Sequence, residues 1–427
     1  MRKGLGLIFG AACAFGATWP AMASEAVTPA AVIKSYGDLA EAMYGDALAG
    51  GEALRAAVRE LLDEPSPRTL GAARIAWKAA RNVYVPTEGF RFGNKVVDEW
   101  EGKVNAWPVD EGLIDYVDVK TYGENKEDNP LFSANVIAKR KLQLGSEQIN
   151  TSKIDKKLLR KLHQALEVEA NVATGYHAIE FLLWGQGLNG PGPGAGNRQA
   201  TDYDTGKCTN GNCDRRRAYL RAATDLLVDD LAEITAAWKQ GGAARTELTG
   251  KGADGGLTAI LTGLGSLSYG ELAGERIKLG VVLHDPEEAH DCFSDNTQNA
   301  HYYDQVGMMA IWNGRYLRSD GKFVSGPSMA DLARQKSPEA AKRLDDAMAA
   351  SLGKLQQVKT TADSGEMAYH TMLAAGNDAG NKMLLDASES IVAQARAVQG
   401  VVAALNLKIE LEESKGLAKL AKEKKTQ

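Results

Sequence analysis

Apolar and alanine side chains recur every three or four residues through most of this chain, which is the spacing of one face of an α-helix. Runs of alternating valine, isoleucine and threonine, which are typical of strands, are scarce. The sequence therefore predicts an all-α protein. The ranges that carry the helical pattern are 29–49, 52–63, 67–85, 131–142, 153–185, 214–239, 256–284, 326–353 and 362–405.

The segment 67–85 illustrates the pattern. A helix separates its apolar and charged side chains onto different faces. The apolar positions are Ile75, Trp77, Ala80, Val83 and Tyr84, and the charged positions on other faces are Arg74, Lys78 and Arg81.

The length of 427 residues exceeds what one hydrophobic core usually supports, so we expect two packed helical-bundle halves. The glycine-rich segment 241–256 lies between two long predicted helices and is the expected boundary. The predicted units are therefore residues 24–240 and residues 257–410. Residues 411–427 form a basic tail, which we expect to be a solvated helix end and not a binding element.

The first residues have the pattern of a secretory signal peptide. Arg2 and Lys3 precede an apolar run from Leu5 to Trp19, and a small-residue cleavage site follows, with the cut expected after Ala23. The run is too short to span a bilayer, and no later segment is long enough. We therefore expect residues 1–23 to direct a protein that does not itself span the membrane to a Gram-negative periplasm.

The net charge of the chain without its leader argues against one class of partner. Loss of two cations with the leader changes the formal net charge from −5 to −7. An acidic balance argues against nucleic acid as a partner, because phosphate binding needs a basic patch.

Three cysteines remain after the leader. Cys208 and Cys213 flank a Thr-Asn-Gly-Asn turn, and an oxidising, exported setting favours a disulfide between them. A zinc site is the weaker interpretation, because no second cysteine pair or histidine cluster follows at the required spacing. Cys292 is the odd cysteine: it could be free and buried, or it could compete for Cys208 or Cys213.

The most informative short segment is Gly-Tyr-His-Ala-Ile-Glu at residues 175–180. His177 and Glu180 are three residues apart, so a helix places both on one face, where they could bind the same metal ion. The apolar residues that follow, from Phe181 to Trp184, would hold the pair against a core. The alternative is a structural histidine whose hydrogen bond is satisfied by the neighbouring carboxylate.

Further carboxylates in the first half could complete such a site. Glu88 lies in a Thr-Glu-Gly turn, and Asp115 lies one helical turn beyond Glu111. Glu88 could instead form a salt bridge or cap a helix, and the acids before Asp115 could cap the helix that they begin. Arg91 and Arg276 are candidate counter-charges for clustered carboxylates.

The second half contains Glu287 and His290, which repeat the three-residue offset in the order Glu-x-x-His. Helix capping is the alternative for the acid, since it follows a proline at a helix start. Carboxylate and imidazole donors suit iron, and zinc is also compatible with them.

Four sequence blocks point to a known family. They are residues 87–93 (TEGFRFG), 107–115 (WPVDEGLID), 175–185 (GYHAIEFLLWG) and 292–297 (CFSDNT). In this order they resemble the imelysin family, and within it the branch of iron-regulated protein A-like proteins. The third block contains the Gly-x-His-x-x-Glu motif of the family. The similarity extends from about residue 30 to about residue 405.

This resemblance implies an all-helical fold of two bundle-like halves, with His177 and Glu180 near their junction. It also implies an exported protein linked to iron acquisition, and it brings an older label of metallopeptidase. A zinc peptidase helix reads His-Glu-x-x-His, and the inverted version has histidine directly after glutamate. Ala178 and Phe181 occupy those positions here, so the residues favour metal capture over peptide hydrolysis.

Our leading hypothesis is a periplasmic protein that binds iron and passes it to a membrane component of iron uptake. A second hypothesis is a metallopeptidase in which Glu180 activates a metal-bound water. A third is a module that binds a peptide, haem or polysaccharide through the aromatic residues Trp77, Tyr84, Trp107 and Trp184.

Overall fold

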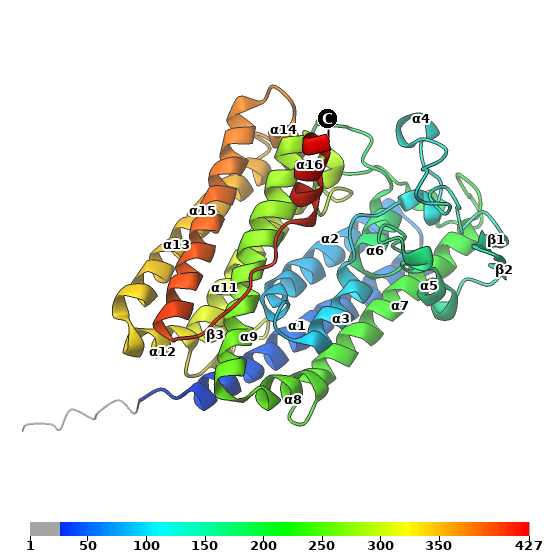
Figure 1. The fold of residues 1–427 in the computed structure, drawn as a ribbon. Helices are drawn as coiled ribbons and strands as arrows, with labels where there is room; N and C mark the ends of the chain where they lie inside the picture. Colours follow the sequence, from blue (N-terminus) through cyan, green and yellow to red (C-terminus); the bar gives the residue numbers. More distant parts are fainter. Residues whose placement is uncertain (1–25, 427) are drawn as a thin grey trace, which may run out of the picture.

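The computed structural model describes residues 26–426, and the predicted signal peptide lies outside this part of the chain. The fold is all-α and consists of two packed helical-bundle halves, as the sequence predicts (Figure 1). Within residues 26–426, none of the helices is both long enough and apolar enough to cross a membrane.

The first half is built around a long N-terminal helix. Helix α1 begins where the Thr28 hydroxyl accepts a 3.3 Å hydrogen bond from the Ala31 amide, and it packs against α2 and α7. The capping box of Ser66 and Thr69 begins α2. The main helices of this half are α1 (Pro29–Asp63), α2 (Pro67–Tyr84), α3 (Lys95–Asn105), α6 (Gly175–Trp184) and α7 (Cys213–Trp238).

The second half packs long helices side by side, seen at the left of Figure 1. They are α9 (Gly252–Ser266), its π-helical continuation η5 (Leu267–Lys278), α10 (Leu279–Leu283), α11 (Thr297–Asn313), α13 (Pro338–Asp363) and α15 (Asp378–Ala404). Buried apolar side chains form a connected core that includes residues of both halves.

Shorter elements connect these helices. They are η1 (Val85–Phe90), η2 (Glu111–Leu113), α4 (Val119–Tyr122), α5 (Lys156–Leu162), η3 (Ala165–Glu167), η4 (Ala200–Asp202), α8 (Ala243–Gly250), η6 (Pro286–Glu288), α12 (Met329–Lys336), α14 (Tyr369–Leu373) and α16 (Lys415–Thr426). The described residues also form two antiparallel hairpins. Strands β1 (Lys141–Leu144) and β2 (Glu147–Asn150) pair with Lys141 opposite Asn150, and β3 (Arg315–Leu317) and β4 (Phe323–Ser325) pair with Arg315 opposite Ser325.

Close backbone contacts join the two halves at η1. A Cβ atom on Gly307 of α11 would lie 2.2 Å from the carbonyl oxygen of Pro86, and one on Gly263 of α9 would lie 2.4 Å from that of Gly89. Only glycine lets the backbones approach so closely. These contacts fix the position of α2 and η1 relative to the second half, and α2 carries a residue of the site described below.

Several predicted helices differ from the structure, and those at 326–353 and 362–405 are each divided, the first into α12 and α13 and the second into α14 and α15. The predicted helix at residues 131–142 is wrong: the Asn135 and Val136 amides donate to the carbonyls of Gly112 and Leu113 at 2.8 and 2.9 Å. The predicted helix at 153–185 is interrupted, because left-handed backbone at Gln164, Leu166 and Glu167 separates α5 from α6. Helices α3 and α11 were not predicted. Several polar side chains of α11 are buried, among them His301 and Asp304. Because its buried face is partly polar, the sequence of α11 does not show apolar residues at helical spacing.

The face assignment for residues 67–85 is also wrong at two positions. Ile75, expected on the apolar face, is 72% exposed, whereas the Arg81 side chain is completely buried. The predicted disulfide between Cys208 and Cys213 is confirmed, and Cys292 is free and buried. Ser414, near the start of the predicted tail, is buried against η5, whereas none of the described side chains of α16 is buried.

Candidate metal centre

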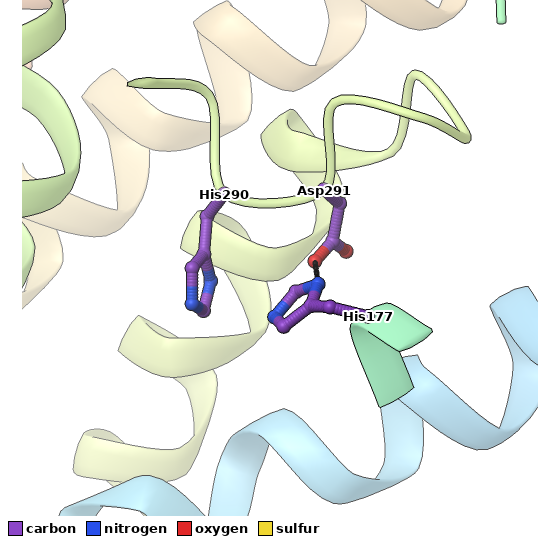
Figure 2. Close-up of side chains that lie close together, drawn as sticks. All are labelled: His177, His290 and Asp291. Carbon is purple, nitrogen blue, oxygen red and sulfur yellow. Dashed lines mark ion pairs between the residues drawn. The ribbon is translucent and has the colours of Figure 1, made fainter. Parts of the chain in front are cut away.

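Two histidines and one aspartate meet at the junction of the two halves. His177 comes from α6, and His290 and Asp291 come from the loop between η6 and α11. Figure 2 shows the two imidazole rings and the carboxylate facing one another. All three residues are buried, and each offers a ligand atom within 4.8 Å of those of the other two. The centroids of the two rings lie 4.7 Å apart.

A glycine at the start of α6 makes the position of His177 possible. Gly175 has a φ of +85°, and a Cβ atom there would lie 2.4 Å from the Val104 carbonyl oxygen at the end of α3. Within α6 every side chain is buried, and the Trp77 indole donates a 2.9 Å hydrogen bond to the Tyr176 carbonyl. Because neighbouring elements enclose α6 on all sides, the helix has a fixed position, and so does the His177 side chain that it carries.

Glu180 orients the His177 ring. Its Oε2 lies 3.0 Å from His177 Nδ1, and its Oε1 accepts a 2.8 Å hydrogen bond from the Ser294 amide. A carboxylate accepts, so the Nδ1 atom carries the proton and Nε2 keeps its lone pair. Among residues 26–426, His177 Nε2 has no hydrogen-bond partner. An imidazole held by a carboxylate with its other nitrogen free is the arrangement that metal-binding histidines adopt.

Arg81 connects the other two members of the cluster. Its Nε donates to Asp291 Oδ1 at 3.1 Å, its Nη2 lies 3.1 Å from His290 Nδ1, and its Nη1 donates to Asn105 Oδ1 at 2.6 Å. A guanidinium only donates, so His290 Nδ1 must accept. The Asn296 side-chain amide donates to the second Asp291 oxygen at 2.9 Å. Arg81 therefore neutralises Asp291 and stabilises a neutral His290 whose proton is on Nε2, so a metal could bind this imidazole only when Arg81 leaves Nδ1.

Burial keeps both imidazoles neutral. Loss of hydration lowers the pKa of His177 and of His290 well below the usual value, and the nearby Arg81 and Arg276 lower both further. Burial and the Asp291 charge raise the pKa of Glu180. Neutral imidazoles are the form that coordinates metals.

A network of charged side chains surrounds the cluster. Arg276 contacts Glu88, Glu271 and Asp304, and Arg91 contacts Glu88, Glu101 and Glu271. The expectation that Arg91 and Arg276 offset clustered carboxylates is confirmed. The Asn105 side chain joins this network to Arg81, because its amide donates to Glu88 and Glu101 at 3.2 and 2.8 Å.

The six residues predicted as metal ligands occupy different places. His177 and His290 lie in the cluster, and Glu180 bonds to His177. Glu88 lies beyond Asn105, paired with Arg276. Asp115 is enclosed by Arg198 and Arg216, whose atoms lie 2.7 and 2.6 Å from its Oδ2. Glu287 is exposed in η6.

Two residues of the centre were missed in the sequence. Asp291 directly follows His290, and this adjacency was the available signal. Arg81 lies beside Ala80 on α2, and its complete burial, which marks it as functional or structural, is visible only in the structure.

The sequence of this chain matches known proteins over most of its length. The family model of imelysin matches residues 40–398, which is most of the chain. The chain belongs to the imelysin family. Within it, the chain is 23% identical over 317 residues to iron-regulated protein A of Synechococcus elongatus, covering 72% of this chain and 69% of that protein.

The fold of this imelysin-family chain has a counterpart among solved structures. A protein described as an iron-regulated protein A precursor from Parabacteroides distasonis superposes with a TM-score of 0.62 and 15% sequence identity. The match covers 88% of this chain and 94% of the other. At that identity the similarity shows the fold, and the residues of the centre are argued from this chain itself.

Gly175 offers a direct test of how α6 is positioned. We expect Gly175→Ala to lower the free energy of unfolding by about 2–4 kcal/mol, because the new Cβ atom clashes with backbone and the left-handed φ is strained. Denaturant unfolding followed by circular dichroism measures this. Gly71→Ala in α2 is the matched control, since a Cβ atom there meets nothing within 4 Å. Equal stability of the two variants would contradict the account of α6.

Proposed function

We propose that this protein is an exported, imelysin-like metal-binding protein that captures iron in the periplasm for uptake or homeostasis. The metal is its cargo, held at His177, His290 and Asp291. The names of the relatives connect them with iron regulation, and the function of this chain is argued from its site. A membrane component of iron uptake would receive the ion.

The donor set is the observation that carries the proposal. Two neutral imidazoles and one carboxylate, all buried at the junction, are the set that non-haem ferrous iron binds, with further positions left open. Zinc accepts the same donors, so the titration below includes it. His177 presents an Nε2 that no side chain of residues 26–426 satisfies, and a buried unsatisfied nitrogen costs about 1–3 kcal/mol unless a ligand or water fills the gap.

The charge balance around the cluster also favours a cation. The described network contains more carboxylates than guanidiniums: Glu88, Glu101, Glu180, Glu271, Asp291 and Asp304 against Arg81, Arg91 and Arg276. Burial and neighbouring carboxylates raise the pKa of Glu180 and Asp304, which shows that negative charge is unfavourable here without a further cation. A bound metal cation would offset this excess of negative charge.

The two alternative functions have less support. Glu180 holds the His177 ring through one oxygen and accepts from the Ser294 amide through the other, which is a positioning role and not that of a peptidase base. Trp77 and Tyr84 are fully buried in the core, where they are not available to bind a peptide or polysaccharide. Trp107 packs 5.0 Å from the His177 ring and 5.7 Å from the His290 ring, as a wall of the metal centre.

Metal titration tests the proposal. Purified protein is titrated anaerobically with ferrous iron, and separately with zinc and with weakly chelated ferric iron, by calorimetry. We expect one bound ion per chain and a loss of affinity of at least about a hundredfold in His177→Ala, because a direct ligand is removed. His284→Ala is the control, since this exposed residue bonds only to the Leu373 carbonyl at 3.0 Å.

Two outcomes would change the conclusion. Unchanged stoichiometry and affinity in His177→Ala would overturn the proposal. Cleavage of an unfolded protein substrate that is abolished both by a chelator and by Glu180→Gln would favour the peptidase instead.

A further inference from the structure

A cavity of about 560 Å³ lies beside the metal centre and reaches one of its histidines. His290 and Trp107 line it, whereas His177 does not. Arg81 contacts His290 at its Nδ1 atom, on one side of the ring. The cavity also reaches exposed residues, among them Glu169 and Lys419. It therefore connects the surface with a histidine of the candidate site.

The lining of this cavity suits a hydrated cation. It contains seven glutamates against four lysine and arginine residues. Two of those four cations, Arg91 and Arg276, are already paired with carboxylates of the buried network. A cleft with an excess of one charge concentrates ions of the opposite sign. The same excess of negative charge would repel a metal that is bound to an anionic chelator.

A strap formed by residues 405–414 covers part of this cavity. It leaves the end of α15, runs along the face of α9 and η5, and leads into α16 (Figure 1). A Cβ atom on Gly270 of η5 would lie 2.2 Å from the carbonyl oxygen of Glu412. The backbone of the strap therefore contacts the backbone of η5 directly at this glycine. The Ser414 hydroxyl and the Gly416 amide both donate to Glu275, the latter at 3.0 Å.

The described side chains of helix α16 are partly or largely exposed. Among residues 415–422, none is buried. Lys415 reaches Glu169 of the first half at 3.7 Å, but both side chains are largely exposed, and such pairs contribute little stability. A second cavity of about 710 Å³ shares Glu413 and Ser414 with the first, so there is space on both sides of this segment. Segments with few buried contacts open at low free-energy cost.

We propose that the 560 Å³ cavity is the route by which a hydrated metal cation reaches His290, and that the strap with α16 gates it. This inference rests on the proposed function. Opening of the strap changes the barrier to metal entry and release, while the buried ligands set the affinity.

Gly270→Ala tests the gate without truncating the chain. The added methyl group must displace the strap from η5. Stopped-flow mixing with ferrous iron, followed by transfer to a chelator, should show association and dissociation both accelerated by roughly tenfold, with affinity changed less than about twofold, because a gate acts on both directions. Gly353→Ala in α13 is the matched control, since a Cβ atom there meets nothing within 4 Å. Ser414→Ala, which removes the bond to Glu275, should have the same effect if Gly270→Ala does not fold.

A second measurement needs no metal. Diethyl pyrocarbonate modifies accessible imidazoles, and peptide mass spectrometry gives the rate at each histidine. We expect His290 to react faster in Gly270→Ala and Ser414→Ala than in the unmodified chain, while His301, which is completely buried, stays unreactive. Unchanged metal kinetics and unchanged His290 reactivity in both variants would overturn the gate. Faster His290 reaction in a protein that binds no metal would refute the proposed function but keep the gated cavity.

Discussion

Arg81→Met is expected to destabilise the metal-free protein by about 3–5 kcal/mol and to make its stability strongly dependent on metal, since a buried carboxylate loses its partner. The guanidinium is completely buried and bonds to Asp291, His290 and Asn105. In the metal-free protein it supplies the positive charge that the cluster requires. A metal bound at the same cluster would replace that charge in the variant.

Denaturant unfolding with and without ferrous iron or zinc measures this coupling. The metal should restore more stability to Arg81→Met than to the unmodified protein, and the affinity of the folded variant for metal should rise. Arg74→Met is the matched control on the same helix. Arg74 is half-buried and donates to the carbonyls of Leu183 and Arg198 at 3.0 and 2.8 Å, so its loss should not alter metal binding. Equal metal stabilisation of both variants would contradict the role of Arg81.

Asp115→Ala is expected to destabilise the protein by about 3–5 kcal/mol while leaving the metal affinity of the folded protein unchanged, because it leaves buried guanidiniums without their partner. Arg216 donates to both Asp115 oxygens, at 2.6 and 3.1 Å, and Arg198 donates at 2.7 Å. Although burial opposes it, these two cations lower the pKa of Asp115 below its ordinary value. The carboxylate is therefore fully engaged in structure.

Asp346→Ala provides the comparison for this variant. Asp346 forms a 2.6 Å ion pair with Lys342, but both side chains are exposed, so its removal should cost less than about 1 kcal/mol. Urea unfolding gives the stabilities, and metal titration of each folded variant gives the affinities. A tenfold or greater loss of metal affinity in Asp115→Ala would return this residue to the set of ligands.

The distinction between ligand and positioning residue could not be made from sequence. His177 and Glu180 fit the spacing of two ligands on one helix face, and the structure uses that same spacing for a hydrogen bond of 3.0 Å. The second oxygen of Glu180 is held by the Ser294 amide, 114 residues along the chain. Which of the two interpretations holds depends on what faces the helix, and periodicity contains no such information.

Local chemistry determined the class of the fold and some members of the site. Helix spacing is a property of neighbouring residues, so the sequence predicts the all-α architecture and the helix that carries His177. It also predicts His290 as a candidate ligand, because a glutamate lies three residues before it. The short Cys208–Cys213 disulfide was predicted on the same local basis.

Only the tertiary structure decided which side chains meet. Arg81 and Asp291 are 210 residues apart, and their 3.1 Å contact exists because glycine surfaces on α9 and α11 let η1 approach the second half closely. The cluster of His177, His290 and Asp291, its neutralising guanidinium and the cavity under the strap all lie between segments that are distant in the chain. Their positions follow from the packing of whole helices, which depends on many contacts at once and leaves no periodic signal in the sequence.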